Sequence, residues 1–84
     1  MIEAHILVEC YAGGRAEEHP RRVTIGNRVY LVSRLLGEYL EVPLNSNQQL
    51  RWYKVLTEAG LVLEIVRSTD GAWRLIDIQD SASA

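Results

Sequence analysis

The chain contains a single cysteine, Cys10, so no disulfide can form within it, which is typical of proteins from reducing compartments. It has no apolar run near the roughly 20 residues that a membrane-spanning helix needs. The sequence begins Met-Ile-Glu-Ala-His, without the basic segment that opens a secretory signal peptide, and the apolar positions that follow alternate with polar ones. These absences predict a cytoplasmic protein without a membrane span.

Patterns of catalysis and ligand binding are also missing. The Gly13-Gly14 pair is followed neither by Lys-Ser nor by a third glycine, so it is not a phosphate-binding loop. In a regular strand Cys10 and His5 would face opposite sides, which prevents them from sharing one metal ion. We therefore expect no enzyme activity, no cofactor and no catalytic or metal-binding residue. A thiol or metal site that uses Cys10 and a histidine is the least favoured of our hypotheses.

The charge is small but unevenly distributed. The net charge of -2 over 84 residues argues against a uniformly basic nucleic-acid binder. Residues 15–34 nevertheless hold five arginines against two glutamates, a local net charge of +3, and the rest of the chain carries -5. A contact surface, if the chain has one, is expected in this basic region.

A Gly26-Asn27 pair separates two short runs rich in Val, Ile, Tyr and Thr, and this pattern predicts a β-hairpin with strands at 21–25 and 28–32. The expected cross-strand pairs are Ile25 with Arg28, Val23 with Tyr30, and Arg21 with Val32. In this register Arg22 faces away from Arg21, so the arginines do not form one stripe. The second strand is apolar on both faces, which indicates a central strand or an interface.

Further strands are expected at 2–11, 50–57, 61–67 and 72–78, where apolar and polar residues alternate or β-branched residues gather. The uncharged segment 42–49 is expected to be a loop. The fold class is therefore all-β, a small antiparallel meander of about five to six strands that can curl into a partly open barrel. We expect a single β domain at 1–78 and a flexible C-terminal tail at 79–84.

The spacing of apolar residues in two segments also supports an alternative to the all-β fold. Apolar residues within 32–40, and again within 48–59, also recur at helical intervals, with Asn47 as an N-cap and Gly60 after the last turn. A helix at about 48–59 followed by a β-hairpin would make a winged helix, an α+β fold that binds DNA. That fold needs a third helix, whereas residues 1–31 show strand alternation and a hairpin. The all-β interpretation is therefore preferred.

Four motifs occur in order along the chain. They are Val-Glu-Cys-Tyr-x-Gly at 8–13, Glu-x-Pro-Arg-Arg at 18–22, Tyr-Lys-Val at 53–55 and Trp-x-Leu at 73–75. Their order and spacing resemble a family of small, uncharacterised bacterial β-rich proteins, over about residues 6–76. The resemblance implies a β-meander and implies no activity. The uncharged 42–49 segment departs from the family pattern.

Together these features favour a small non-enzymatic module of unknown cellular role that acts through protein–protein contact. The expected contact surface consists of the aromatic and basic residues of the first half of the chain: Tyr11, Arg15, Arg21, Arg22, Arg28 and Arg34. The expected partner is a protein of unknown identity, and a homodimer is a further hypothesis. The alternative function is nucleic-acid binding, through a basic hairpin surface with aromatic residues or through the winged helix.

Overall fold

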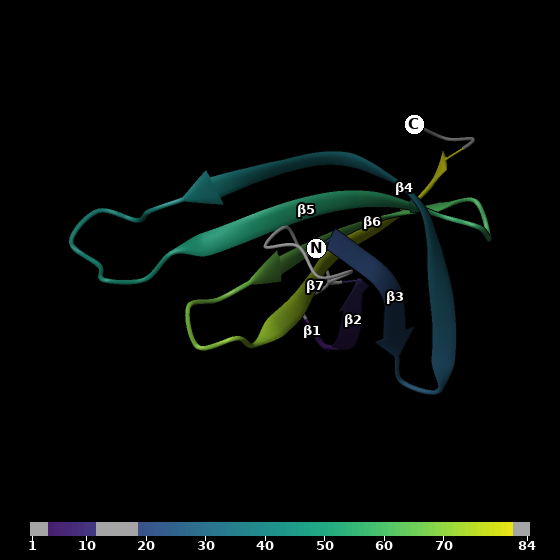
Figure 1. The fold of residues 1–84 in the computed structure, drawn as a ribbon, viewed down its shortest axis with the longest axis horizontal. Coiled ribbons are helices and arrows are strands. Elements are labelled where there is room, and N and C mark those ends of the chain that lie inside the picture. Colours follow the sequence, from purple (N-terminus) through teal and green to yellow (C-terminus); the bar gives the residue numbers. More distant parts are fainter. Residues whose placement is uncertain (1–3, 12–18, 82–84) are drawn as a thin grey trace.

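The computed structural model describes residues 4–11 and 19–81, and all regular structure in these ranges is β-strand (Figure 1). The strands are β1 (Ala4–His5), β2 (Leu7–Tyr11), β3 (His19–Ile25), β4 (Arg28–Glu41), β5 (Leu50–Thr57), β6 (Leu61–Arg67) and β7 (Trp73–Asp80). The all-β prediction is confirmed. Within the described ranges, the chain has no helix with the length and apolar character needed to cross a membrane.

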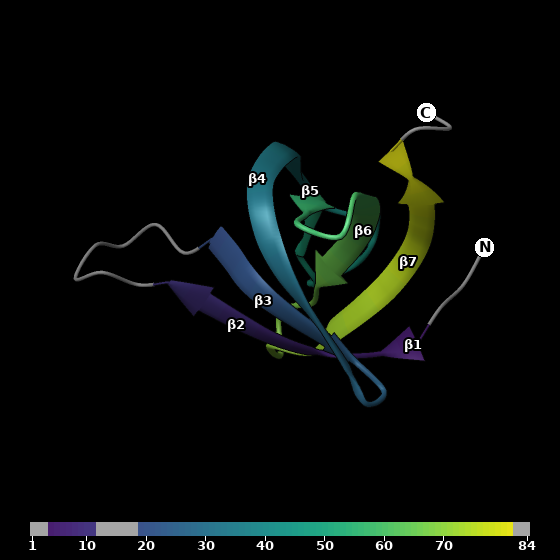
Figure 2. The ribbon, with the colours of Figure 1, turned by 90° about the vertical axis from the view of Figure 1, so that its right-hand side faces the viewer.

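The strands form one antiparallel sheet in the order β1-β7-β6-β5-β4-β3-β2. The strands at the two ends of this order, β1 and β2, are joined by Ile6 alone. The segment 4–11 therefore pairs with β7 through β1 and with β3 through β2. The sheet is curled, so that β7 and β3 both lie beside this one segment (Figure 2). The result is the curled, partly open barrel expected of a twisted meander.

Strand β4 produces the sharpest bend of the sheet. Its first residues, 28–31, pair with β3, and its later residues, 32–41, pair with β5. The register with β5 shifts twice, at Ser33 and at Leu36, each of which is an extra residue that has no partner on β5. Such β-bulges bend a strand and increase its twist, so β4 can pass from one side of the curled sheet to the other.

The core lies inside the curl. Side chains from β3, β5, β6 and β7 fill it, and the most enclosed ones are Val23, Tyr53, Val55, Leu63, Ile65 and Leu75. In β5 the alternation is strict, since Tyr53, Val55 and Thr57 are buried and their neighbours are half-buried or exposed. This period of two is the reason that the helix expected by the alternative at 48–59 is wrong. As a strand, β5 pairs with β4 on one side and with β6 on the other, and this pairing supplies partners for its backbone N–H and C=O groups.

The Gly26-Asn27 hairpin forms as predicted near its turn. Ile25 pairs with Arg28, and Val23 pairs with Tyr30. Gly26 has a φ of 63°, which is the conformation that glycine adopts at the first central position of a type II′ hairpin turn. The pairing ends at Arg22 and Leu31, so the third expected pair, Arg21 with Val32, does not form.

Two expected boundaries also change. The segment 32–40, whose apolar residues also recur at helical intervals, is not a helix but part of strand β4. Strand β7 runs to Asp80, with Gln79 and Asp80 paired to β6, so the strand extends two residues into the expected tail. Residues 82–84 lie outside the described ranges.

Candidate functional site

The outer face of β2, β3 and β4 is built by strand alternation. Val8, Val23 and Tyr30 form one register row that points into the core. The rows on either side point outward and consist of Leu7, Thr24 and Val29, and of Glu9, Arg22 and Leu31. The apolar members of these two rows, Leu7, Val29 and Leu31, are 64%, 57% and 44% exposed. We call these three residues the outer apolar cluster.

A bulge places two arginines on this face. Glu9 pairs with Arg22, and the next residue of β2, Cys10, pairs with Pro20, so Arg21 is an extra residue in β3. Both Arg21 and Arg22 are consequently exposed, between the buried residues Pro20 and Val23. Pro20 has no backbone N–H to donate, and sheets commonly accommodate proline at such bulges. The expectation that Arg22 faces away from Arg21 is therefore wrong.

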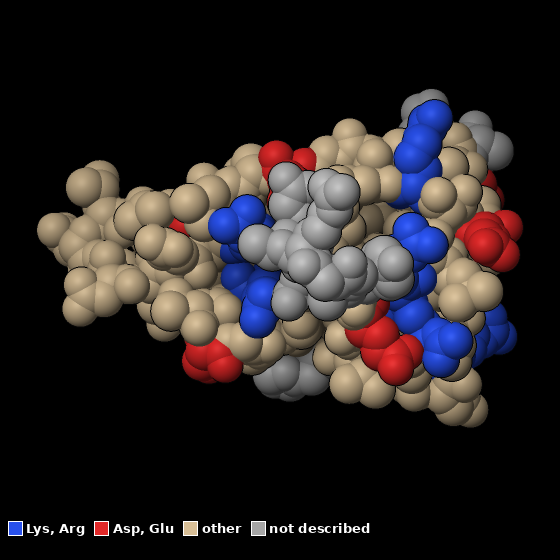
Figure 3. All heavy atoms as spheres, viewed as in Figure 1, with Lys and Arg blue, Asp and Glu red and all other residues tan. Residues whose placement is uncertain are grey.

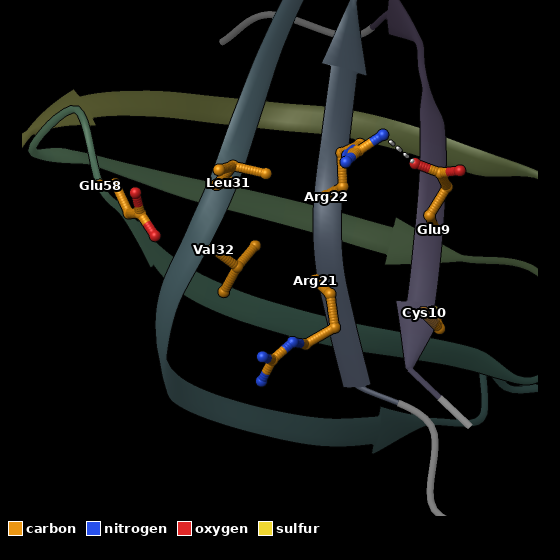
Figure 4. Close-up of a pocket in the computed structure, with 7 residues that line it drawn as sticks. All are labelled: Glu9, Cys10, Arg21, Arg22, Leu31, Val32 and Glu58. Atoms are coloured by element: carbon orange, nitrogen blue, oxygen red, sulfur yellow. Dashed lines mark ion pairs between the residues drawn. The ribbon is translucent and has the colours of Figure 1, made fainter. Parts of the chain in front are cut away.

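The two arginines border a shallow hollow of about 400 Å³. Its lining residues are Glu9, Cys10, Arg21, Arg22, Leu31, Val32 and Glu58. Figure 4 shows that Arg22 points toward Glu9 on β2, whereas Arg21 points toward the β4 side. Glu58 comes from the turn between β5 and β6, and its backbone N–H donates to the carbonyl of Leu31 at 2.9 Å, which holds that turn against β4.

The electrostatics of the hollow are mixed. Arg22 Nη1 lies 3.3 Å from Glu9 Oε2, and both side chains are more than half exposed. Such an ion pair contributes less than about 1 kcal/mol to folding, so its main effect is to orient the Arg22 side chain. Over the wider face, Figure 3 shows basic side chains gathered over β3 and β4 with acidic ones among them.

The other predicted surface residues do not join this hollow. Arg28 is exposed at the hairpin turn, and Arg34 lies beyond the Ser33 bulge, where it pairs with Leu56 of β5. The backbone of Tyr11 pairs with His19, but its side chain is outside the described part of the structure. Arg15 is also outside the described residues. The structure therefore brings together Arg21 and Arg22 out of the six predicted residues.

The residues weighed for thiol or metal chemistry are Cys10 and the histidines. Cys10 is half-buried beside the hollow and pairs with Pro20, so it is one residue out of register with His19 on the neighbouring strand. The imidazole of His19 is directed to Glu38, with Nε2 3.5 Å from a carboxylate oxygen, and Glu38 also approaches Arg51 at 3.7 Å. No group of three or more His, Cys, Asp and Glu side chains suited to a metal ion occurs in residues 4–11 and 19–81.

An aromatic pair on a different part of the sheet was not predicted. Tyr39 and Trp52 face each other across β4 and β5, with ring centroids 5.7 Å apart and ring planes within 6°. The indole Nε1–H donates to Glu41 at 3.0 Å. Desolvation, followed by the charges of Glu64 and Glu41, raises the pKa of Tyr39 above 10.0. The sequence signal was obscured because 32–40 also matched helical spacing.

Comparison with known proteins adds no relative: no family model matches the chain, and neither a curated protein nor a solved structure is similar to it. The resemblance to small bacterial β-rich proteins stays a prediction.

Proposed function

We propose that this protein is a small non-enzymatic module that binds another protein through the outer face of β2, β3 and β4. The observation that carries the proposal is the outer apolar cluster, because its three side chains occupy neighbouring rows of one sheet face and all remain exposed. Gathered apolar side chains on a protein surface are typical of contact sites. A reducing, cytoplasmic setting belongs to the same proposal, since it fits the single cysteine.

The arginines define the chemistry of the partner. Arg21 and Arg22 lie beside Leu31 at the edge of the apolar cluster, and Arg28 lies at the turn next to Val29. Arginine is enriched in protein interfaces and forms paired hydrogen bonds with carboxylates. The expected partner therefore presents apolar side chains toward the cluster and carboxylates toward the arginines.

Nucleic-acid binding has less support from the geometry. Binding of single strands relies on exposed aromatic rings that lie among basic side chains, so that bases can stack. Tyr30 packs against the core, while Tyr39 and Trp52 stack on each other beside Glu41. Among the described side chains, no exposed aromatic ring borders the hollow of Arg21 and Arg22. The winged-helix route is removed by strand β5.

The proposal can be tested with immobilised synthetic peptides of three kinds, which alternate leucine with glutamate, with lysine or with serine. We expect the protein to bind the leucine–glutamate peptide best, and more weakly as salt is added. The double variant Leu7→Ser, Leu31→Ser should lose this binding, and Arg21→Ala with Arg22→Ala should lose its preference for glutamate. Circular dichroism would verify that each variant is folded.

A matched control uses the other exposed apolar side chains of the chain. Val42→Ser with Leu44→Ser removes two comparably exposed residues from the loop between β4 and β5 and should leave peptide binding unchanged. Equal loss in this control would show non-specific adhesion and overturn the proposal. Binding of a single-stranded oligonucleotide at moderate salt, lost on substitution of Arg21 and Arg22, would favour the nucleic-acid alternative instead.

A further inference from the structure

The hairpin of β4 and β5 projects from the rest of the molecule. Its loop, residues 42–49, forms the far left end of the chain in Figure 1, further out than the turn between β6 and β7. No charged residue occurs from 42 to 50. In Figure 3 the end of the molecule that carries this loop shows no basic or acidic side chain. We call residues 39–52 the projecting end. Its outermost part can meet another surface without desolvating a charge.

The outermost side chains of the projecting end are aliphatic and exposed. Leu44 is 92% exposed, the highest value among the large apolar side chains of the described ranges, and Val42 and Leu40 are 60% and 48% exposed. They stand on a protruding tip instead of a flat patch. A folded protein partner would need a matching cavity for this tip, whereas fluid lipid chains can close around it. The tip is therefore suited to a lipid surface.

The backbone of the loop already has several of its hydrogen-bond partners. Pro43 has no N–H to satisfy, and the N–H of Gln48 donates to Ser46 Oγ at 3.0 Å. The hydroxyl of Thr69, from the turn between β6 and β7, accepts from the N–H of Gln49 at 2.6 Å and donates to the carbonyl of Gln49 at 3.2 Å. Unpaired backbone groups are costly in contact with lipid, so these bonds lower the cost of placing the loop there.

The pair of Tyr39 and Trp52 lies behind the tip, at the depth of a membrane interface. Tyr39 comes three residues before Val42, which is about 10 Å at the rise of a strand. Its ring is 57% exposed and stacks on the half-buried ring of Trp52. Tryptophan and tyrosine concentrate at membrane–water interfaces. A tip that enters the boundary between headgroups and acyl chains by about 5–10 Å leaves this pair among the headgroups.

The charges at the base of the projecting end balance. Glu41 and Arg51 flank the uncharged segment, and Lys54 pairs with Glu64 across β5 and β6. Each of these two sets has one charge of each sign, so neither favours an anionic lipid over a zwitterionic one. The aliphatic and aromatic side chains would therefore supply the binding free energy, and the lipid need carry no net charge.

From the aliphatic tip, the satisfied loop backbone and the aromatic pair behind it, we propose that the projecting end binds the surface of a phosphatidylcholine bilayer. Val42 and Leu44 enter the boundary of the acyl chains, and Tyr39 and Trp52 lie among the headgroups. The contact is peripheral, and no part of the chain crosses the bilayer. It uses a different surface from the outer apolar cluster and does not depend on the proposed function.

The first test is sedimentation of the protein with sucrose-loaded phosphatidylcholine vesicles over a range of lipid concentration. The wild-type chain should sediment with the vesicles, and added salt should not release it. Leu44→Ser should lower the partition coefficient about tenfold, because one buried leucine side chain is lost. Val42→Ser with Leu44→Ser should lower it further. The matched control Leu7→Ser with Leu31→Ser should bind vesicles like the wild type, which separates failure of this contact from failure of the proposed function.

Tryptophan fluorescence tests the depth of the contact. Vesicles of brominated phosphatidylcholine should quench the emission of the wild-type chain and quench Trp52→Phe much less, because the other tryptophan, Trp73, packs against the core residue Tyr53. Absence of vesicle binding, or equal binding by Leu44→Ser, would overturn the proposal. So would binding only to anionic vesicles that salt abolishes, which would indicate attraction by the arginines. Self-association that Leu44→Ser removes would show instead that a second copy covers the tip.

Discussion

At the scale of single residues, Thr57 is a buried polar side chain at the end of β5, where the chain turns toward β6. Its hydroxyl accepts a hydrogen bond from the backbone N–H of Leu61 at 3.1 Å. The carbonyl of Thr57 accepts a second bond from the N–H of Gly60 at 3.0 Å. One residue thus satisfies two backbone donors of the turn, which also supplies Glu58 to the candidate site.

We expect Thr57→Val to lower the free energy of unfolding by about 1–3 kcal/mol, because the shape of the side chain is kept while the Leu61 N–H loses its acceptor. Urea unfolding measures the loss. The control Thr57→Ser keeps the hydroxyl, so the Leu61 amide should stay protected from hydrogen exchange in Thr57→Ser and exchange faster in Thr57→Val. Equal protection of that amide in both variants would contradict the assigned bond.

Tyr53 provides a prediction on pH. Its ring is almost completely buried and packs at a tilt against Trp73, with centroids 5.5 Å apart. Desolvation by this burial is the largest cause that raises the pKa of Tyr53 above 10.0. The folded state therefore binds the phenolic proton more tightly than the unfolded state, and this contribution to stability is lost as the pH rises from 10.0 through the folded pKa.

We accordingly expect the wild-type protein to lose stability at alkaline pH more steeply than Tyr53→Phe, which has no phenol at this position. Thermal unfolding of both proteins at a series of pH values above and below 10.0 gives the comparison. Parallel curves for the two proteins would show that Tyr53 titrates in the same way when folded and unfolded.

At the scale of elements, the hairpin between β3 and β4 depends on one glycine conformation. Gly26 has a positive φ of 63°, and an added Cβ would find open space, so any cost of substitution comes from the backbone. Gly37, in the middle of β4, also has open space around it, but its φ lies outside the left-handed region. The two glycines form a natural pair for comparison.

Gly26→Ala should destabilise the protein by about 1–2 kcal/mol, the cost of a left-handed conformation for a residue with a Cβ. Gly37→Ala should be neutral or stabilising by up to about 1 kcal/mol, since alanine restricts the unfolded chain. Chemical denaturation of dilute protein distinguishes the two. Effects of the same sign and size would mean that the hairpin turn does not control the stability of β3 and β4.

At the scale of the whole molecule, stability depends on one small core that all the longer strands share. Leu63 of β6 belongs to this core and is 0% exposed, whereas Leu44 in the loop after β4 is 92% exposed. A chain of this size buries a smaller fraction of its surface than a larger domain, so the loss of one core side chain is a large share of its stability.

Leu63→Ala should therefore cost about 2–5 kcal/mol in a single cooperative transition. Leu44→Ala, with the same chemical change, should stay within about 0.5 kcal/mol of wild type. Calorimetry or urea unfolding gives both values. A large cost for Leu44→Ala would contradict its exposed position in the loop.

The sequence alone determined the features that depend on neighbours along the chain. The gathering of Val, Leu and Ile predicted β6, and the strand prediction at 50–57 is confirmed as β5. Gly26-Asn27 predicted the hairpin and its first pairs, because a two-residue turn sets the register of the residues beside it. The same reasoning predicted a contact region that includes Arg21 and Arg22, but it placed these two side chains on opposite faces, whereas both border one hollow.

Tertiary structure alone decided the bulges at Arg21, Ser33 and Leu36. A bulge is an extra residue relative to the opposite strand, so it cannot be read from one strand in isolation. These residues brought Arg21 and Arg22 to one hollow and bent β4 between two halves of the sheet. The local pattern thus determined the strands, whereas pairing with distant strands determined which side chains reach the surface together.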